Sequence, residues 1–422
     1  MEKSFLTRIG LPEQFIWGFV GLFLFVLGAT IETSWFSSYL SSLGFASASV
    51  SVIFTAYGIF VMIAAWFTGI GTQVWGVRNM MWLGVIVFFV SSIPLVLIAI
   101  PMKSYWLVMG TYMLRGMAYP LFSYSFLVWI NYRTDKEILA RAASWFWIFF
   151  SLGMTIVGPM AASALIPIIG ETGLLYAGFI FVILGVIFAL IINRDRISLP
   201  KSENSPMKEF FEGITIMFQR PRLGISVLVK AINDFGKFGF VIIMPLYLTQ
   251  FGFSTSEWLT VWGSINIVNI FANYLFGYIG DKIGWRRTVV LFSGTLCGSA
   301  TLLLYFAPQV FGHSSIAIFV PLCIYAVGLS AFGPLSALIP NLAPDKKGAA
   351  ISCLNLGSGL SNFLGPLVVS LFIGPFGNLG AMIAIAVSYY LASILAGFLK
   401  TPEELESKKE RFENKNSENI II

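Results

Sequence analysis

Long apolar stretches recur along almost the whole chain and are separated by short polar loops. A helix that crosses a membrane needs about 20 mostly apolar residues, and twelve stretches meet this requirement. They cover residues 16–41, 50–72, 80–100, 104–131, 139–166, 172–192, 223–250, 257–280, 287–308, 315–341, 348–373 and 377–399. The pattern predicts an all-α membrane protein with twelve transmembrane helices.

The two halves of this pattern resemble each other. Residues 39–45 read YLSSLGF and residues 247–253 read YLTQFGF, and Gly-Pro pairs recur at 158–159 and 365–366. An internal duplication of this length is typical of transporters built from two parallel halves with the substrate site between them. We expect six-helix bundles over residues 1–192 and 223–400. A linker with a short amphipathic helix (193–222) would join them, and a charged tail (401–422) would follow.

Charge and composition agree with a membrane protein and exclude several functions. Charged residues make up 11% of the chain, whereas soluble domains carry about 25%. Most of the 26 Lys and Arg residues fall in loops on the side of both termini, which predicts cytoplasmic termini by the positive-inside rule. The net charge of +6 is thereby explained without a nucleic-acid partner. One histidine and three scattered cysteines favour neither a metal site nor a disulfide framework.

The loop after the eighth apolar stretch carries a recognisable motif. Residues 277–287 read GYIGDKIGWRR, which resembles the signature loop of the major facilitator superfamily. We predict that Asp281, Arg286 and Arg287 gate the transporter, with Asp281 pairing with an arginine or a helix N-terminus. The alternative is a basic loop with an incidental acid. In the first-half copy, GIGTQVWGVR at 69–78, Gln73 replaces the acid, so a charged latch is expected in the second half alone.

Two single charges lie at membrane depth in the first half. Glu32 and Arg115 fall midway along the first and fourth apolar stretches, where an unpaired charge costs roughly 2.5–3.5 kcal/mol or more. One interpretation is a proton switch, in which protonation of Glu32 releases Arg115; the other is a static ion pair. The repeat places Phe240 opposite Glu32, so proton coupling is expected to belong to the first half.

Further polar and aromatic residues are candidates for a substrate site. Lys230, Asn233, Asp234 and Lys237 share one helical face, either as a wall of the site, as a second titrating site or as a self-neutralising cluster. The candidate substrate-binding residues are Trp35, Tyr39, Tyr57, Tyr119, Trp147, Asn233, Asp234, Asn266, Asn269, Asn355, Ser358 and Asn362. Amides and aromatic faces suit hydroxylated ligands. The alternative roles are hydrogen bonds between helices for the amides and packing for the aromatic rings.

Several strings extend the resemblance over nearly the whole chain, up to Lys400. They are LPEQFIWG (11–18), RGMAYPLFSYSF (115–126), FGFSTSEWL (251–259) and KGAAISCLNLGSGLSNFLGP (347–366). They resemble the polyol permeases of the superfamily, such as ribitol and arabinitol transporters. This resemblance implies a monomeric, proton-linked importer of ribitol, arabinitol or xylitol in the bacterial inner membrane. Glu32 and Arg115 then match, by span and depth, the acid–arginine pair of related sugar–proton symporters.

The sequence favours other functions less than polyol transport. Arg115, Lys230 and Lys237 could instead bind a carboxylate, which would make the chain a symporter of a sugar acid or another small organic anion. A membrane sensor would usually carry a soluble signalling domain, and the tail at 401–422 is short. An enzyme is not expected, because the chain offers no nucleophile–base set. No cofactor is expected, with the proton as the coupling ion.

Overall fold

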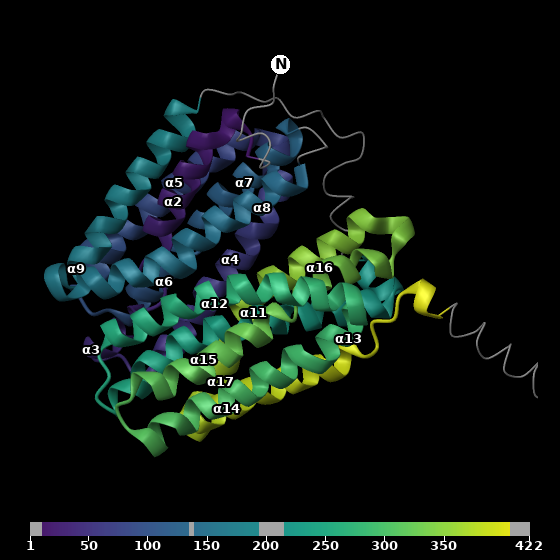
Figure 1. Cartoon of the computed structure of the whole chain (residues 1–422). Helices are drawn as coiled ribbons and strands as arrows, with labels where there is room; N and C mark the ends of the chain where they lie inside the picture. The colour runs from purple at the N-terminus through teal and green to yellow at the C-terminus, as the bar shows by residue number, and fades with distance from the viewer. Residues whose placement is uncertain (1–10, 135–138, 194–214, 406–422) are drawn as a thin grey trace, which may run out of the picture.

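The computed structural model describes residues 11–134, 139–193 and 215–405, and within these ranges it contains helices and no strands (Figure 1). The prediction of an all-α membrane fold is therefore confirmed. Most of the predicted linker helix and the tail beyond Leu405 lie outside the described residues, so these two boundaries stay predictions.

The first half is a bundle of helices that follow one another through short turns. Its elements are η1 (Glu13–Phe15), α2 (Ile16–Thr30), α3 (Phe36–Ser42), α4 (Ser47–Trp75), α5 (Val77–Pro94), η2 (Leu95–Ala99), α6 (Tyr105–Arg115), α7 (Ala118–Arg133), α8 (Leu139–Ser151), η3 (Leu152–Val157), α9 (Gly158–Val186) and η4 (Ile187–Ile192). The segments η2, η3 and η4 are π-helical continuations of neighbouring α-helices. Each π-helical segment adds local irregularity to a span without ending it.

The second half repeats this arrangement. Its elements are α11 (Pro221–Thr249), α12 (Thr255–Ile283), α13 (Trp285–Thr288), η5 (Val289–Ser293), α14 (Gly294–Phe311), α15 (Ser315–Ser330), α16 (Leu335–Leu338), η6 (Pro340–Leu342), η7 (Pro344–Lys346) and α17 (Lys347–Ala396). At the start of α12, Ser254 and Glu257 form a capping box. This reciprocal pair of hydrogen bonds fixes where the helix begins.

Two of the helical runs are too long for one crossing. Ser144–Ile192 spans 49 residues and Cys353–Ala396 spans 44, about twice the length that a bilayer needs. Each run contains one glycine with a positive φ, Gly170 at 69° in α9 and Gly377 at 64° in α17. A side chain would strain the backbone there, so these glycines kink the run between two successive predicted spans.

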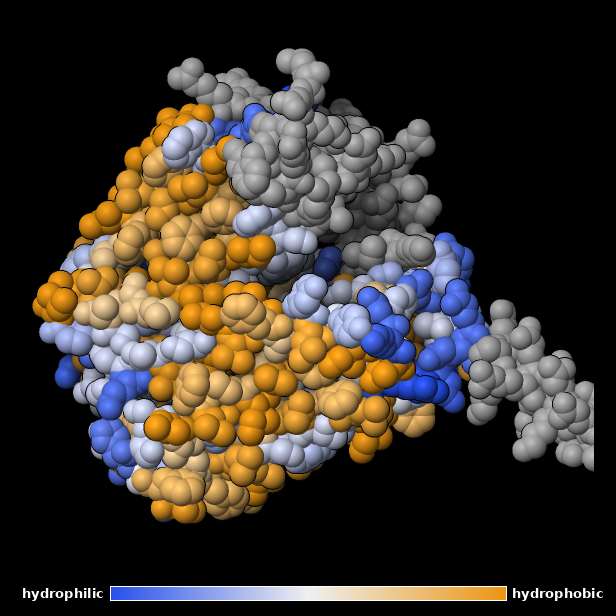
Figure 2. All heavy atoms as spheres, viewed as in Figure 1, coloured by the Kyte–Doolittle hydropathy of each residue, from blue (hydrophilic) through white to orange (hydrophobic). Residues whose placement is uncertain are grey.

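The two bundles lie side by side and meet through α4 with α17, α9 with α12, and α3 with α11. We call the end of the molecule where α2 begins and α17 ends the basic end, since Arg78, Arg133 and Arg286 lie at helix boundaries there. The other is the opposite end. Figure 1 shows the bundles diverging toward the basic end, and Figure 2 shows the surface hollowed between them with polar residues along the hollow.

Hydrogen bonds between the halves gather away from the basic end. The hydroxyl of Ser37 donates to the Val241 carbonyl at 2.7 Å, and the indole of Trp258 donates to the Ser34 carbonyl at 3.2 Å. Nearer the membrane middle, a Cβ placed on Gly58 would lie 2.1 Å from a backbone oxygen of α17. Glycine thus lets α4 and α17 touch through their backbones, and the halves are closed against each other on this side.

Candidate functional site

Glu32 and Arg115 form a buried ion pair at interruptions of two helices. Glu32 lies in the turn between α2 and α3, and Arg115 is the last residue of α6, just before the break that precedes α7. Arg115 donates from Nε to Glu32 Oε1 at 3.0 Å and from Nη2 to Oε2 at 2.7 Å. The side chains are 2% and 0% exposed. The two charges face each other as predicted, and their role in proton coupling stays a prediction.

The remaining capacity of the Arg115 guanidinium is also used. Its Nη1 donates to the hydroxyl of Ser92, and its Cζ lies 4.7 Å from the centre of the Phe88 ring. A buried cation has lost its water, so it is stabilised by hydrogen-bond acceptors for its N–H groups and by an aromatic face. Sequence reasoning missed both residues of α5. The pair Ser91-Ser92 inside an otherwise apolar stretch was the available signal for one of them.

Two tyrosines near this pair keep hydroxyl groups without partners. The rings of Tyr57 and Tyr112 stack with their centroids 4.6 Å apart. Both hydroxyls are buried, and neither has a hydrogen-bond partner among the described residues. A buried polar group without a partner is costly and calls for an explanation, such as a bound ligand or water. Tyr57 was a predicted substrate residue, and Tyr112 was not.

A second charged cluster lies on α11 in the other half. Asp234 accepts from Lys237 Nζ at 2.8 Å and from Lys230 Nζ at 3.4 Å, and the amide of Asn233 donates to it at 3.1 Å. The side chains of Lys230, Asp234 and Lys237 are 15%, 24% and 28% exposed. Two ammonium groups therefore face one carboxylate, which leaves one positive charge in excess at a partly accessible position. Neutralisation within the cluster is incomplete.

One predicted pair of substrate residues spans the two halves. The hydroxyl of Tyr119 on α7 donates to Asn362 Oδ1 on α17 at 3.3 Å, and both residues are buried. The carbonyl of Asn362 is also the backbone atom nearest to Gly58. This contact therefore lies where α4, α7 and α17 converge, in the interface between the halves.

The other predicted amides and the hydroxyl of Ser358 differ in their surroundings. Asn266 donates to the Thr155 carbonyl of the first half at 3.0 Å. Asn269 donates at 2.8 Å to the carbonyl of Ala326 on α15, which is the hydrogen bond between helices that the alternative interpretation describes. Asn355 is exposed, while Ser358 donates back into its own helix. Their roles in substrate binding stay predictions.

Three predicted aromatic residues have packing contacts in this conformation. Trp35 is fully buried and donates to the Ile31 carbonyl at 2.8 Å, and Tyr39 shares a hydrogen bond of 3.0 Å with the Thr172 hydroxyl. Trp147 is exposed and lies edge-on to Phe150, with ring centroids 5.6 Å apart. The rings of Trp35 and Tyr39 contact each other, with centroids 5.9 Å apart, whereas Trp147 packs separately. The binding roles of all three residues stay predictions.

The signature loop is arranged differently from the predicted latch. Asp281 is exposed and accepts from the indole of Trp285 at 3.2 Å, and within the described residues it pairs with no arginine. Arg286 binds the Glu404 carboxylate at 2.9 Å and donates to the Gly397 carbonyl at 3.4 Å. Arg287 is exposed. Among the described residues the expected Asp281–Arg pair is thus not formed in this conformation, in which the halves are apart at the basic end.

Arg286 and its repeat partner Arg78 hold the last helix of their own halves. Arg78 donates to the carbonyls of Leu190 and Asn193 at the end of η4, the first of these contacts being very short and the second 3.0 Å. Arg286 does the same for α17 through Gly397. A cation at the C-terminus of a helix satisfies free carbonyls and the helix dipole. This shared capping role was not predicted, although the repeat had matched the two positions.

Comparisons with known proteins agree with this architecture. The family described as Major Facilitator Superfamily matches residues 18–344 and 267–421. An alpha-ketoglutarate permease of Bacillus subtilis is 43% identical over 98% of this chain and 96% of its own length. A D-arabinitol transporter of Klebsiella pneumoniae is 34% identical over 95% and 96%.

Solved structures share the fold at low sequence identity. The crystal structure of a D-xylose-proton symporter has a TM-score of 0.70 and 15% identity, and the match covers 95% of this chain and 99% of that one. The family match covers most of the chain, and the described helices, the internal repeat and the signature loop are consistent with it. The chain therefore belongs to the major facilitator superfamily and is a multi-pass membrane transporter rather than an enzyme.

Proposed function

We propose that this transporter imports a small organic anion, such as a dicarboxylate of the 2-oxo acid type, together with protons. The observation that carries the proposal is the excess positive charge of Lys230 and Lys237 over Asp234 at a partly exposed position. An unneutralised charge at membrane depth is unfavourable. A substrate carboxylate would neutralise it through charge-assisted hydrogen bonds. The similarity to an alpha-ketoglutarate permease supports the same substrate class.

Proton coupling suits an anionic substrate on energetic grounds. Each negative charge that enters against an inside-negative potential of 100 mV costs about 2.3 kcal/mol. A proton carried with it cancels that cost, and each unit of pH gradient adds about 1.4 kcal/mol. In the proposed cycle Glu32 takes up the proton, which weakens its hold on Arg115.

The orientation of the cycle follows from the positive-inside rule. We place the basic end in the cytoplasm, so that this conformation, with its halves joined at the opposite end, opens inward. Alternating access then requires the halves to rock about the contact between α4 and α17. The proposed unit is a monomer in a bacterial plasma membrane.

A linear sugar alcohol is the second candidate substrate. It is favoured by the similarity to transporters of D-arabinitol and ribitol, each 34% identical to this chain. Tyr119 and Asn362 add a hydroxyl and an amide from opposite halves, and such groups suit vicinal hydroxyls. A neutral polyol would leave the excess charge of the α11 cluster in place, and for this reason we rank it second.

The test is counterflow in proteoliposomes with labelled alpha-ketoglutarate, and with ribitol, D-arabinitol, xylitol and succinate as competitors. We expect the acids to compete and the polyols not to. Lys230→Gln and Lys237→Gln should each weaken acid transport by at least about tenfold, as expected for a hydrogen bond to a charged group. Lys103→Gln, which removes an exposed lysine at the opposite end of the molecule, is the matched control. Counterflow of labelled ribitol or D-arabinitol, with no counterflow of alpha-ketoglutarate, would replace the first candidate with the second.

A further inference from the structure

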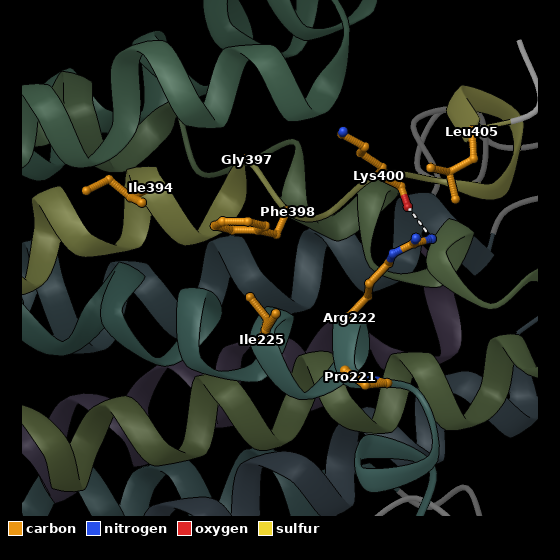
Figure 3. Close-up of a pocket in the computed structure, with 8 residues that line it drawn as sticks. All are labelled: Pro221, Arg222, Ile225, Ile394, Gly397, Phe398, Lys400 and Leu405. Carbon is orange, nitrogen blue, oxygen red and sulfur yellow. Dashed lines mark hydrogen bonds between the residues drawn. The ribbon is translucent and has the colours of Figure 1, made fainter. Parts of the chain in front are cut away.

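A groove with mixed character lies at the basic end of the second half, away from the interface between the halves (Figure 3). It forms where the first turns of α11 lie beside the last turn of α17, and its volume is about 560 Å³. The residues that define its chemistry are Arg222, Ile225, Ile394, Phe398, Lys400 and Leu405. Neither the transport site nor the ion pair in the first half includes any of them.

One wall of the groove is apolar and open to the surroundings. Ile394 is 63% exposed and Phe398 is 59% exposed. Further toward the membrane middle, Leu391 on α17 and Leu228 on α11 are also exposed, each about one helical turn from a groove residue. In a membrane protein such a strip faces lipid, so an acyl chain fits along it.

The rim of the groove is basic. The guanidinium of Arg222 donates from Nη1 to the Lys400 carbonyl at 3.2 Å. Among the described residues this is the one hydrogen bond of the Arg222 side chain. The side chain of Lys400 is directed away from Arg222 (Figure 3), so its ammonium adds a second positive charge on the other side of the same turn. The nearby carboxylate of Glu404 is engaged by Arg286 at 2.9 Å, so it does not offset the charge of the rim. The rim therefore complements an anion.

The remaining wall is supplied by the start of the C-terminal tail. Thr401 and Glu404 exchange hydrogen bonds in a capping arrangement, with the Thr401 N–H 3.3 Å from Glu404 Oε2. The Arg286–Glu404 ion pair anchors this turn to the signature loop. Leu405 follows directly and lines the groove. The groove is thus built by two segments that are distant in sequence, the start of α11 and the continuous stretch from the end of α17 into the tail.

We propose that this groove binds an anionic phospholipid from the membrane leaflet at the basic end. Its phosphate lies beside Arg222, with the Lys400 ammonium on the other side of the same turn, and one acyl chain runs along Ile394 and Phe398. Basic pockets beside transmembrane helices bind lipid headgroups in this way. The adjacency of charge and exposed apolar surface selects a lipid over a free phosphate, which would leave the apolar wall uncovered. The bound lipid would tie the tail, the signature loop and the start of α11 together.

The experiment measures lipid binding to the purified full-length protein by native mass spectrometry, with phosphatidylglycerol and phosphatidylcholine of equal chain length as probes. The wild type should prefer phosphatidylglycerol. A basic residue near an anionic surface contributes about fivefold in affinity, so Arg222→Gln/Lys400→Gln should lose about 30-fold. Lys103→Gln, an equal loss of charge per site at the opposite end of the molecule, should change affinity less than twofold. Phe398→Ser should weaken both lipids while the preference persists.

Two further measurements, on a charge-retaining double variant and in the presence of inorganic phosphate, complete the test. Arg222→Lys/Lys400→Arg retains both charges and should keep most of the preference, which separates charge loss from misfolding. Inorganic phosphate at millimolar concentration should compete poorly, whereas complete displacement of the lipid would show a simple anion site. Equal binding of the two lipids by the wild type, or an unchanged preference in the neutral double variant, would overturn the proposal. None of these readouts depends on the transported substrate.

Discussion

Removal of the charge of Glu32 tests the ion pair most directly. Glu32→Gln keeps the shape of the side chain but leaves the Arg115 guanidinium buried at 3% exposure without its counter-charge. The wild-type pair has two charge-assisted hydrogen bonds, of 3.0 and 2.7 Å. Breaking a buried pair by removing one partner costs about 3–5 kcal/mol. Because the glutamine oxygen still accepts one bond, we expect a loss near the lower end of that range.

The double variant Glu32→Gln/Arg115→Met separates the two costs. Replacement of a whole buried ion pair by neutral groups is often neutral or stabilising, so the double variant should recover most of the stability that Glu32→Gln loses. Thermal unfolding in detergent measures both changes. If the double variant is less stable than the single one, the attraction within the ion pair exceeds the cost of removing its two charges from water. The reasoning on its energetics would then be wrong.

Transport in the same variants distinguishes a proton switch from a static pair. With the membrane potential clamped to zero, one proton per substrate and one unit of pH gradient allow about tenfold accumulation. Glu32→Gln should lower that ratio to about one while counterflow exchange persists. Glu171→Gln, which removes an acid at the opposite end of the same half, is the control and should accumulate substrate normally. Wild-type accumulation in Glu32→Gln would show that Glu32 is not the coupling acid.

Three further predictions concern the contacts around the site. Gly58→Ala should destabilise the closed interface by about 1–3 kcal/mol and slow transport, measured as initial counterflow rate, because the added Cβ would lie 2.1 Å from the backbone of α17. Arg286→Gln should lower the melting temperature slightly in detergent, since a partly exposed ion pair contributes about 0.2–1 kcal/mol and the cap of α17 is lost as well; no change would contradict the capping role. At the start of α12, the main-chain N–H of Ser254 donates to the Glu257 carboxylate at 2.8 Å and closes the capping box. Glu257→Ala should therefore destabilise the protein by about 0.5–2 kcal/mol, seen as a lower melting temperature, and an unchanged melting temperature would refute this.

The fold was predictable from the sequence because membrane spans impose a strong apolar pattern. Residues 139–166 and 172–192 were expected as two spans, and the structure separates them at Gly170, where φ is 69°. The π-helical segments, such as η3 directly before Gly158, were not foreseen. They depend on how neighbouring helices pack, which the apolar periodicity of one helix does not record.

Within the site, the contacts that could be predicted were those of groups that are costly to bury without a partner. Glu32 and Arg115 were expected to pair because neither charge is tolerated singly at membrane depth. Ser92 and Phe88, which complete the surroundings of Arg115, carry no such penalty and gave no comparable signal. For Asn269, helical spacing predicted a polar face but could not show that this face meets Ala326 on α15.

The two repeated halves differ in where their buried charges lie and in how exposed these charges are. Where the first half has Glu32, the second has Phe240, whose ring lies 4.8 Å from that of Tyr325. The second half carries its charges earlier on α11, at Lys230, Asp234 and Lys237. The first-half pair is sealed from water, whereas the α11 cluster is 15–28% exposed. On the proposed function, Glu32 would exchange its proton when the halves move, and the accessible α11 cluster would meet a dissolved substrate in the present conformation. We infer that coupling and recognition are placed in different halves, so that rocking is the step that links them.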